Sequence, residues 1–323
     1  MVTLLWTLLV ILALLGAAHL WTRAITREAE TLIPMAGTRL DLPGGAIHYV
    51  EAGSHDAPSL VLIHGLSGKL QHFTYAMMDD LARDHRVIAL DRPGCGYSSP
   101  FDASAKGLSA QAEVIGMFLD RLEVQNPVLV GHSLGGALAL AMALERPDKT
   151  AGMALLCPLT HPVDAVPEVF KPLEISGPRL RNFVAQTLYG PFGKLLRGRN
   201  LRLVFAPEPA PDDFMTRGGG LLALRPSAFL SSCADLQASA GSIEAQAGRY
   251  DTLTVPGAVL NAAGDEILDP VTQGRPMRQF GLGYEELDNR GHMIPITAPT
   301  ECADFVRRIA AKCHAEGATS TGT

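Results

Sequence analysis

The sequence predicts an α/β fold in which helices flank a mostly parallel central sheet, with a second, helical unit inserted into it. Two observations predict this fold class. From about residue 46, short apolar runs alternate with helix-like segments, a rhythm typical of an α/β sheet. Several of these runs are apolar throughout, as expected when helices cover both faces of a parallel strand.

The N-terminal segment, residues 1–22, differs in composition from the rest of the chain, because residues 2–21 carry no charged side chain. About twenty apolar residues in a helix are long enough to cross the roughly 30 Å hydrocarbon core of a bilayer. Arg23 and Arg27 follow directly. By the positive-inside rule we expect a transmembrane anchor that leaves the rest of the chain in the cytoplasm. The alternative is a signal segment cleaved after Ala18, with the protein secreted or periplasmic.

The α/β core is expected to comprise residues 40–159 and 252–315, followed by a disordered polar tail at 316–323. Helices are expected at 109–122 and 134–144. The expected strands lie at 46–50, 59–63, 86–90, 127–130, 153–156, 257–260 and 284–287.

The alternation stops between residues 160 and 251. This stretch is rich in proline and glycine, has helical patches such as 180–189, and offers no convincing strand. It is too long for an ordinary loop between two core strands. We therefore expect it to form a helical lid over the end of the sheet.

Composition and charge narrow the choice of function. The formal net charge is −6, without a long run of one sign. Nucleic-acid binding needs a basic face, so we expect no nucleic-acid partner. The five cysteines are scattered and show no zinc spacing, so we expect reduced thiols and no metal. Oligomeric state is left open by the sequence.

A candidate nucleophile lies in the string GHSLG at 131–135. This G-x-S-x-G string directly follows one expected strand and directly precedes an apolar, alanine-rich helix. A nucleophile elbow requires this strand, turn and helix, with glycines where the sharp turn crowds the backbone. We therefore expect Ser133 to project its hydroxyl at the carboxyl end of the sheet.

A serine hydroxyl needs a base, and the base needs an acid to orient it. His292 lies in a loop after the last expected strand, so it satisfies the chain order serine, acid, histidine. Asp265 follows the strand at 259–263 through Gly264 and is the expected acid. Asp269 is the alternative acid, although it precedes a proline and is placed to cap the next helix.

An oxyanion hole should complete the site. One donor is expected to be the backbone N–H of Leu134, the residue after the nucleophile. The other should come from the loop HGLSG at 64–68, where we expect the N–H of Leu66. This set of groups needs neither a metal nor an organic cofactor.

With these motifs the chain resembles the lid-bearing members of the α/β-hydrolase superfamily from about residue 40 to 311. The segment DRPGCGYS at 91–98 adds to the resemblance, which implies that Asp91 and Gly94 shape the pocket without taking part in chemistry. Dehalogenases and epoxide hydrolases of this superfamily have aspartate at the elbow, where this chain has Ser133. Cys95 departs from the histidine or phenylalanine that is common in the family.

The resemblance implies a serine hydrolase that cleaves carboxylic esters through an acyl-enzyme on Ser133. Six phenylalanines in the expected lid favour an apolar acyl pocket. Next to a membrane segment, a lipid-like ester such as a monoacylglycerol is the favoured substrate. Carbon–carbon, amide and lactone hydrolases would use the same triad and remain alternatives. So does a binding protein on this fold that does not turn its ligand over.

Overall fold

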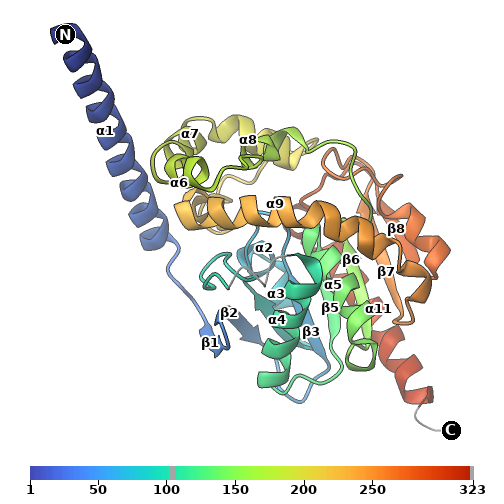
Figure 1. Ribbon diagram of the computed structural model, residues 1–323. Helices are drawn as coiled ribbons and strands as arrows, with labels where there is room; N and C mark the ends of the chain where they lie inside the picture. Colours follow the sequence, from blue (N-terminus) through green and yellow to red (C-terminus); the bar gives the residue numbers. More distant parts are fainter. Residues whose placement is uncertain (102–106, 321–323) are drawn as a thin grey trace.

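The core of the molecule is one sheet of eight strands in the order β1-β2-β4-β3-β5-β6-β7-β8. The computed structural model describes residues 1–101 and 107–320 (Figure 1). At one side of the sheet, β1 pairs antiparallel with β2, and β2 pairs antiparallel with β4. The remaining neighbours are parallel. Their bounds are β1 Thr38–Leu42, β2 Gly45–Ala52, β3 Ser59–Ile63, β4 Arg86–Leu90, β5 Val128–His132, β6 Gly152–Leu156, β7 Gly257–Ala262 and β8 Gly283–Leu287.

The central strands are buried on both faces, which explains their continuously apolar sequences. Every residue of β3, β4, β5 and β6 is buried. The two faces form two separate hydrophobic clusters, because alternate residues of a strand point to opposite sides. The mostly parallel α/β sheet predicted from the sequence is therefore confirmed.

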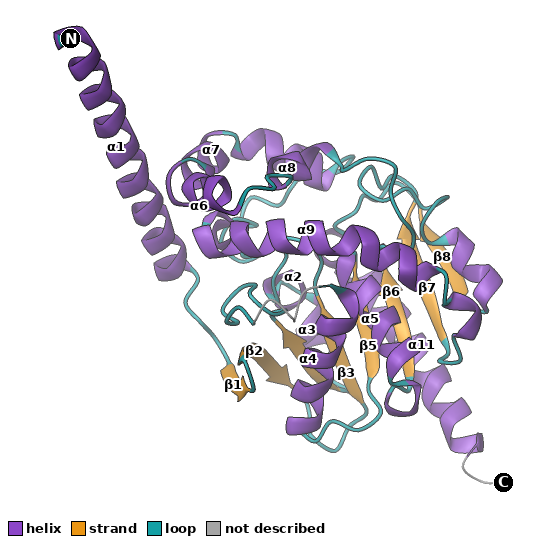
Figure 2. Cartoon of the chain, viewed as in Figure 1, coloured by secondary structure: helices purple, strands orange, loops and turns teal. Residues whose placement is uncertain are grey.

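Helices cover the sheet on both sides (Figure 2). The helices α4 (Leu108–Arg121) and α5 (Leu134–Glu145) contribute to the cluster on one face, and α3 (Met77–Leu81) and α11 (Pro299–Ser320) to the other. The shorter helices of the core are α2 Gln71–Thr74, η2 Pro147–Lys149, η5 Tyr250–Thr252, η6 Arg275–Phe280 and α10 Ile294–Thr297.

Between β6 and β7 the described chain is helical and contains no strand, in the segment expected to be a lid. These helices lie across the end of the sheet where the parallel strands finish (Figure 1). The longest, α9 (Pro226–Ala247), crosses in front of α5 and was not singled out from the sequence. The others are η3 Glu168–Leu173, α6 Pro178–Thr187, α7 Tyr189–Leu195, α8 Arg197–Phe205 and η4 Gly220–Leu224.

The N-terminal helix α1 runs from Val2 to Leu32, ten residues beyond the segment expected from the sequence. It is long and apolar enough to cross a membrane, and its apolar window is not buried by the protein. Its second half packs against the inserted helices. The side chains of Ile25 and Ala29 are buried in one cluster with residues of η4. Thr22 Oγ1 donates a hydrogen bond to the carbonyl of Thr187, at 3.2 Å.

We predict that the second half of α1 is part of the folded domain. A fragment of residues 37–323 should melt about 10 °C below a fragment of residues 19–323, because Ile25 and Ile33 each contribute roughly 1.5–3 kcal/mol of apolar burial. Thermal unfolding followed by circular dichroism would measure the difference. Equal melting temperatures would show that the second half of α1 does not stabilise the folded domain.

The C-terminus differs from expectation. Helix α11 continues to Ser320, so residues 316–320 are not the irregular tail predicted from their polarity. Helix propagation costs little once a long helix has formed, and Ala315 and Ala318 are good helix formers on either side of Gly317. The last residues of the predicted tail, 321–323, lie outside the described residues.

Candidate active site

Ser133 lies at the sharp turn between β5 and α5. Its backbone has φ 56° and ψ −123°, a left-handed conformation that a non-glycine residue rarely adopts. Strain of this kind concentrates at functional sites. Neighbouring glycines make the turn possible, since a Cβ on Gly135 would collide with the carbonyl oxygen of Ile63, and one on Gly131 with that of Gly135.

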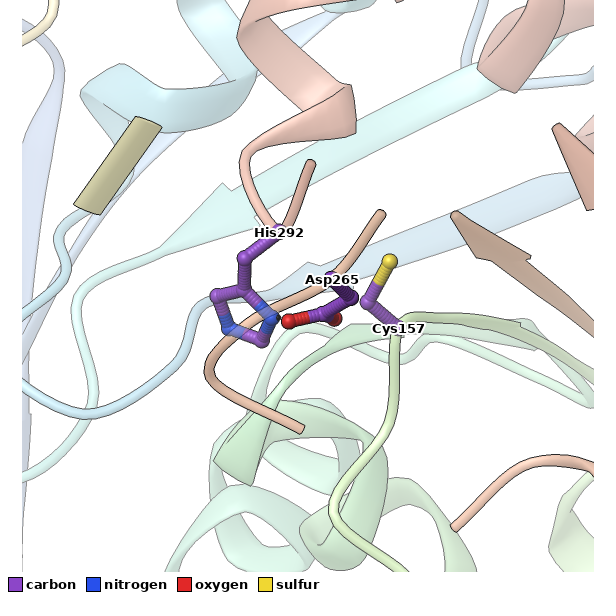
Figure 3. Close-up of side chains that lie close together, drawn as sticks. All are labelled: Cys157, Asp265 and His292. Carbon is purple, nitrogen blue, oxygen red and sulfur yellow. Dashed lines mark hydrogen bonds and ion pairs between the residues drawn. The ribbon is translucent and has the colours of Figure 1, made fainter. Parts of the chain in front are cut away.

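His292 and Asp265 face each other at the ends of two different loops (Figure 3). The imidazole Nδ1 donates to Asp265 Oδ2 at 2.7 Å, and both side chains are buried. The other carboxylate oxygen, Oδ1, accepts the backbone N–H groups of Ile267 and Leu268, each at 2.9 Å. The carboxylate is therefore held in a fixed orientation and holds one tautomer of His292.

The electrostatics of Asp265 favour its ionised form. Burial by itself would raise the pKa of this carboxyl, but attraction to His292 and the three hydrogen bonds lower it below its ordinary value. The alternative acid, Asp269, is exposed and accepts the N–H of Val271 at 2.9 Å. The structure thus brings Asp265 to His292 and leaves Asp269 at a surface turn.

Ser133 and His292 line the same cavity, although within the described chain no hydrogen bond joins Ser133 Oγ to the imidazole. Such contacts are often long in a ligand-free site and tighten when substrate binds. His132 helps to position His292, because its Nε2 donates a hydrogen bond to the backbone carbonyl oxygen of His292 at 2.9 Å. Burial lowers the pKa of His132 to about 3, so it stays neutral. This supporting role was not anticipated from the sequence.

The two expected oxyanion donors lie on either side of Ser133, one on the loop after β3 and one at the start of α5. Leu134 is the first residue of α5, so its N–H has no partner within the helix. Leu66 lines the cavity, and no hydrogen bond of its N–H occurs in the described part of the chain. The loop carrying Leu66 lies against the nucleophile, since a Cβ on Gly65 would be 2.7 Å from Ser133 Cβ.

A buried guanidinium holds this loop in place. Arg92 donates to the carbonyl oxygens of His64 and Gly65, each at 3.0 Å, and to Gln111 Oε1 at 2.8 Å. It also forms a 2.8 Å ion pair with Asp235, which lies on α9. The segment 91–98 therefore shapes the site through Arg92, and a carboxylate from the inserted helices completes that arrangement.

The cavity above Ser133 has a volume of about 650 Å³. Its floor consists of the loops after β3, β5 and β8, and its walls come from η3, α7, α8 and η4. Most wall residues are apolar, including Phe170, Leu201, Val204, Phe214 and Leu224. A cavity of this size and lining suits a small, largely apolar ligand.

Cys157 is a further buried neighbour, which the sequence analysis treated only as one of five reduced thiols. It follows β6 with φ 41°, and its Sγ lies within 4.8 Å of ligand atoms of Asp265 and His292 (Figure 3). Among the described residues, these three groups lie close enough together to hold a metal ion. Burial and the Asp265 charge raise the pKa of this thiol well above its ordinary value, so it remains protonated. A metal would need the thiolate and would also have to displace the His292–Asp265 hydrogen bond.

Comparison with known proteins places this geometry in a family. Residues 58–299, more than half of the chain, match the family described as alpha/beta hydrolase fold. Two solved structures share the fold over most of their length. A bacterial membrane phospholipase A aligns with a TM-score of 0.66 at 24% identity, covering 97% of this chain and 99% of that one. An esterase from Thermogutta terrifontis aligns with a TM-score of 0.64 at 20% identity, covering 86% of this chain and all of that one (100%).

Sequence relatives match over a shorter part. The dihydrolipoyllysine-residue acetyltransferase component of the acetoin cleaving system of Cupriavidus necator is 34% identical over 119 residues. That match covers 37% of this chain and 31% of the relative. The chain thus spans about a third of the length of this relative.

Proposed function

The chain belongs to the α/β-hydrolase fold family, and on that premise we propose that it is a serine hydrolase that cleaves carboxylic esters through an acyl-enzyme on Ser133. One observation carries the proposal. His292 is held by the buried carboxylate of Asp265 and shares a cavity with a serine strained into the elbow conformation. A base, its orienting acid and a nucleophile are thus available to one bound substrate.

The proposed mechanism uses only groups of this chain. Ser133 Oγ attacks the ester carbonyl carbon while His292 Nε2 removes its proton, and Asp265 stabilises the imidazolium that forms. The N–H groups of Leu66 and Leu134 stabilise the oxyanion, each contributing about 3 kcal/mol to the transition state. His292 then protonates the departing alcohol. Water deacylates Ser133 by the same route.

A lipid-like ester, such as a monoacylglycerol, is the proposed substrate class. The apolar cavity supports this, and so does the outer face of the inserted helices. The side chains of Leu180 and Phe183 on α6, and of Phe192 and Leu195 on α7, are exposed. Both helices contact α1. These side chains therefore lie beside the membrane-crossing candidate, where a bilayer would cover them.

We further propose that α1 anchors the protein in the membrane with the catalytic domain in the cytoplasm. Arg23 and Arg27 follow the apolar span directly. The second half of α1 is part of the fold, so the anchor holds the cavity near the bilayer surface. In the alternative, a cleaved signal segment, this region would stay in the domain without the span. Fractionation of tagged protein into membrane and soluble pools distinguishes the two.

The proposed activity is tested with the full chain in detergent micelles. We expect hydrolysis of p-nitrophenyl esters, with a rate that rises from the acetate to a medium-chain acyl group because the cavity walls are apolar. A fluorophosphonate should add once, on the peptide that contains Ser133. Failure to hydrolyse any ester would contradict the esterase proposal. If the adduct nevertheless forms, amide, lactone and carbon–carbon substrates or a non-turnover binding protein become the better interpretation.

A further inference from the structure

A buried lysine lies in the wall of the active-site cavity. Lys69 follows the oxyanion loop and is only 3% exposed. Its Nζ donates one hydrogen bond, to the carbonyl of Gly219, at 3.1 Å. An ammonium group carries three donors. Two of them therefore lack a partner within the described chain.

Other buried cations of the described chain are paired with a carboxylate. Arg92 pairs with Asp235 at 2.8 Å, Arg86 with Glu51 at 2.5 Å, and Arg225 with Glu30 at 3.3 Å. No carboxylate oxygen of the described residues lies within 4.0 Å of Lys69 Nζ, the limit for an ion pair. A buried charge without a partner is costly, so its presence beside a ligand cavity calls for a functional explanation.

A second polar group of the same cavity also lacks a partner. His72 on α2 lines the cavity and is 7% exposed, and its Nδ1 has no hydrogen-bond partner in the part of the chain that the structure describes. Lys69 is close enough to lower the pKa of His72, although burial is the larger cause. A neutral imidazole can donate one hydrogen bond to an anion.

We propose that Lys69, with His72, binds an anionic group of the ester substrate. This rests on the proposed function and specifies the substrate class: an apolar ester that also carries an oxyanion, either a phosphate or a carboxylate. The two remaining N–H donors of the ammonium group would then form charge-assisted hydrogen bonds to the anion, in a site shielded from water. The substrate's ester would still be cleaved at Ser133.

The charge state of Lys69 gives the proposal a pH dependence. Burial, and then repulsion from Arg225, lower the pKa of Lys69 to about 8, while Asp91 and Cys95 oppose the shift. Below about pH 8 the ammonium is charged and attracts an anion. Above it the neutral amine does not, so any preference for anionic esters should fall as the pH rises through 8. The titratable groups that face Lys69 are Arg225, Asp91, Cys95, His64 and His72.

The test compares Lys69→Met with wild-type protein on matched pairs of esters. One pair is monodecanoylglycerol and its phosphate. The other is p-nitrophenyl octanoate and the p-nitrophenyl monoester of octanedioic acid, which carries a terminal carboxylate. We expect Lys69→Met to lower the ratio of kcat/KM for one anionic ester to kcat/KM for its neutral partner by about 10- to 100-fold, as for a lost hydrogen bond between charged groups. The anionic ester that responds identifies the group as phosphate or carboxylate.

Control variants and conditions separate the possible failures. Lys149→Met removes an exposed lysine and should change no ratio. Lys69→Gln repeats the test if the methionine variant does not fold, and the wild-type pH profile needs no variant. An equal loss on neutral and anionic esters would show a structural role and overturn the proposal. Unchanged ratios would also overturn it while leaving the esterase intact. A wild-type protein inactive on all four esters would instead contradict the proposed function.

Discussion

Replacing Ser133 with alanine should lower kcat for ester hydrolysis by about 10⁵- to 10⁶-fold, the size of loss seen when a triad nucleophile is removed. Alanine removes the oxygen that would form the acyl-enzyme, and the other serine among the described residues of the cavity, Ser67, donates its hydroxyl proton to Ser232. The oxyanion donors and the apolar walls are retained, so substrate binding should persist. Steady-state rates with p-nitrophenyl octanoate would measure the loss, and equilibrium binding of the same ester would measure the retained affinity.

The matched control for this change is Ser67→Ala. Ser67 also lines the cavity, has a positive φ of 54°, and donates its hydroxyl proton to Ser232 at 2.8 Å. Its replacement should change kcat by less than about tenfold, because only one neutral hydrogen bond is lost. Ser133→Ala protein that stays active, or a larger loss from Ser67→Ala, would assign the chemistry to a different group.

The fold was largely predictable because its central strands are buried on both faces. The runs at 59–63 and 86–90 are aliphatic after their first residues, Ser59 and Arg86, and the structure makes them β3 and β4 with the same bounds. Strand β1 (Thr38–Leu42) was missed because it lies at the sheet edge, where most of its residues are exposed or half-buried. Strand β1 forms because it pairs with β2, and its own sequence contains no pattern that predicts this pairing.

The length of α1 was missed for a related reason. Charged residues after Trp21 were interpreted as the end of an apolar segment, yet the helix continues with its charges toward solvent. Thr22, Ile25 and Ala29 are spaced by three and four residues, so they share one helical face. That spacing was a usable signal. The spacing could not identify the surface that this face packs against, because η4 lies about two hundred residues later in the chain.

The residues of the site also fall into a group that the sequence could predict and a group that it could not. The elbow, the late histidine and the acid follow from local motifs and chain order, so Ser133, His292 and Asp265 could all be named. The contacts of His132, Cys157 and Lys69 depend on where side chains point after the loops and inserted helices have packed. Sequence spacing does not specify those directions.

Asp265→Asn is expected to lower kcat by about 10⁴-fold while the protein stays folded. The reason lies in the backbone around this side chain. Two N–H groups, of Ile267 and Leu268, bind Oδ1. In the asparagine variant these donors require the amide oxygen, so the amide nitrogen must face His292 Nδ1. The imidazole then has to accept there, and its proton moves to Nε2, the atom that should take the proton of Ser133.

Asp269→Asn provides the matched control, because it makes the same chemical change four residues away. Asp269 is exposed and its Oδ1 accepts one backbone N–H, which an asparagine oxygen can also accept. Its kcat should therefore stay within about threefold of wild type, as for most surface substitutions. Thermal melts of both variants would establish that the loss is catalytic. Should Asp269→Asn inactivate the protein and Asp265→Asn spare it, the acid would have to reach His292 after a rearrangement of the loop that follows β7. The buried carboxylate of Asp265 would then serve only to hold that loop.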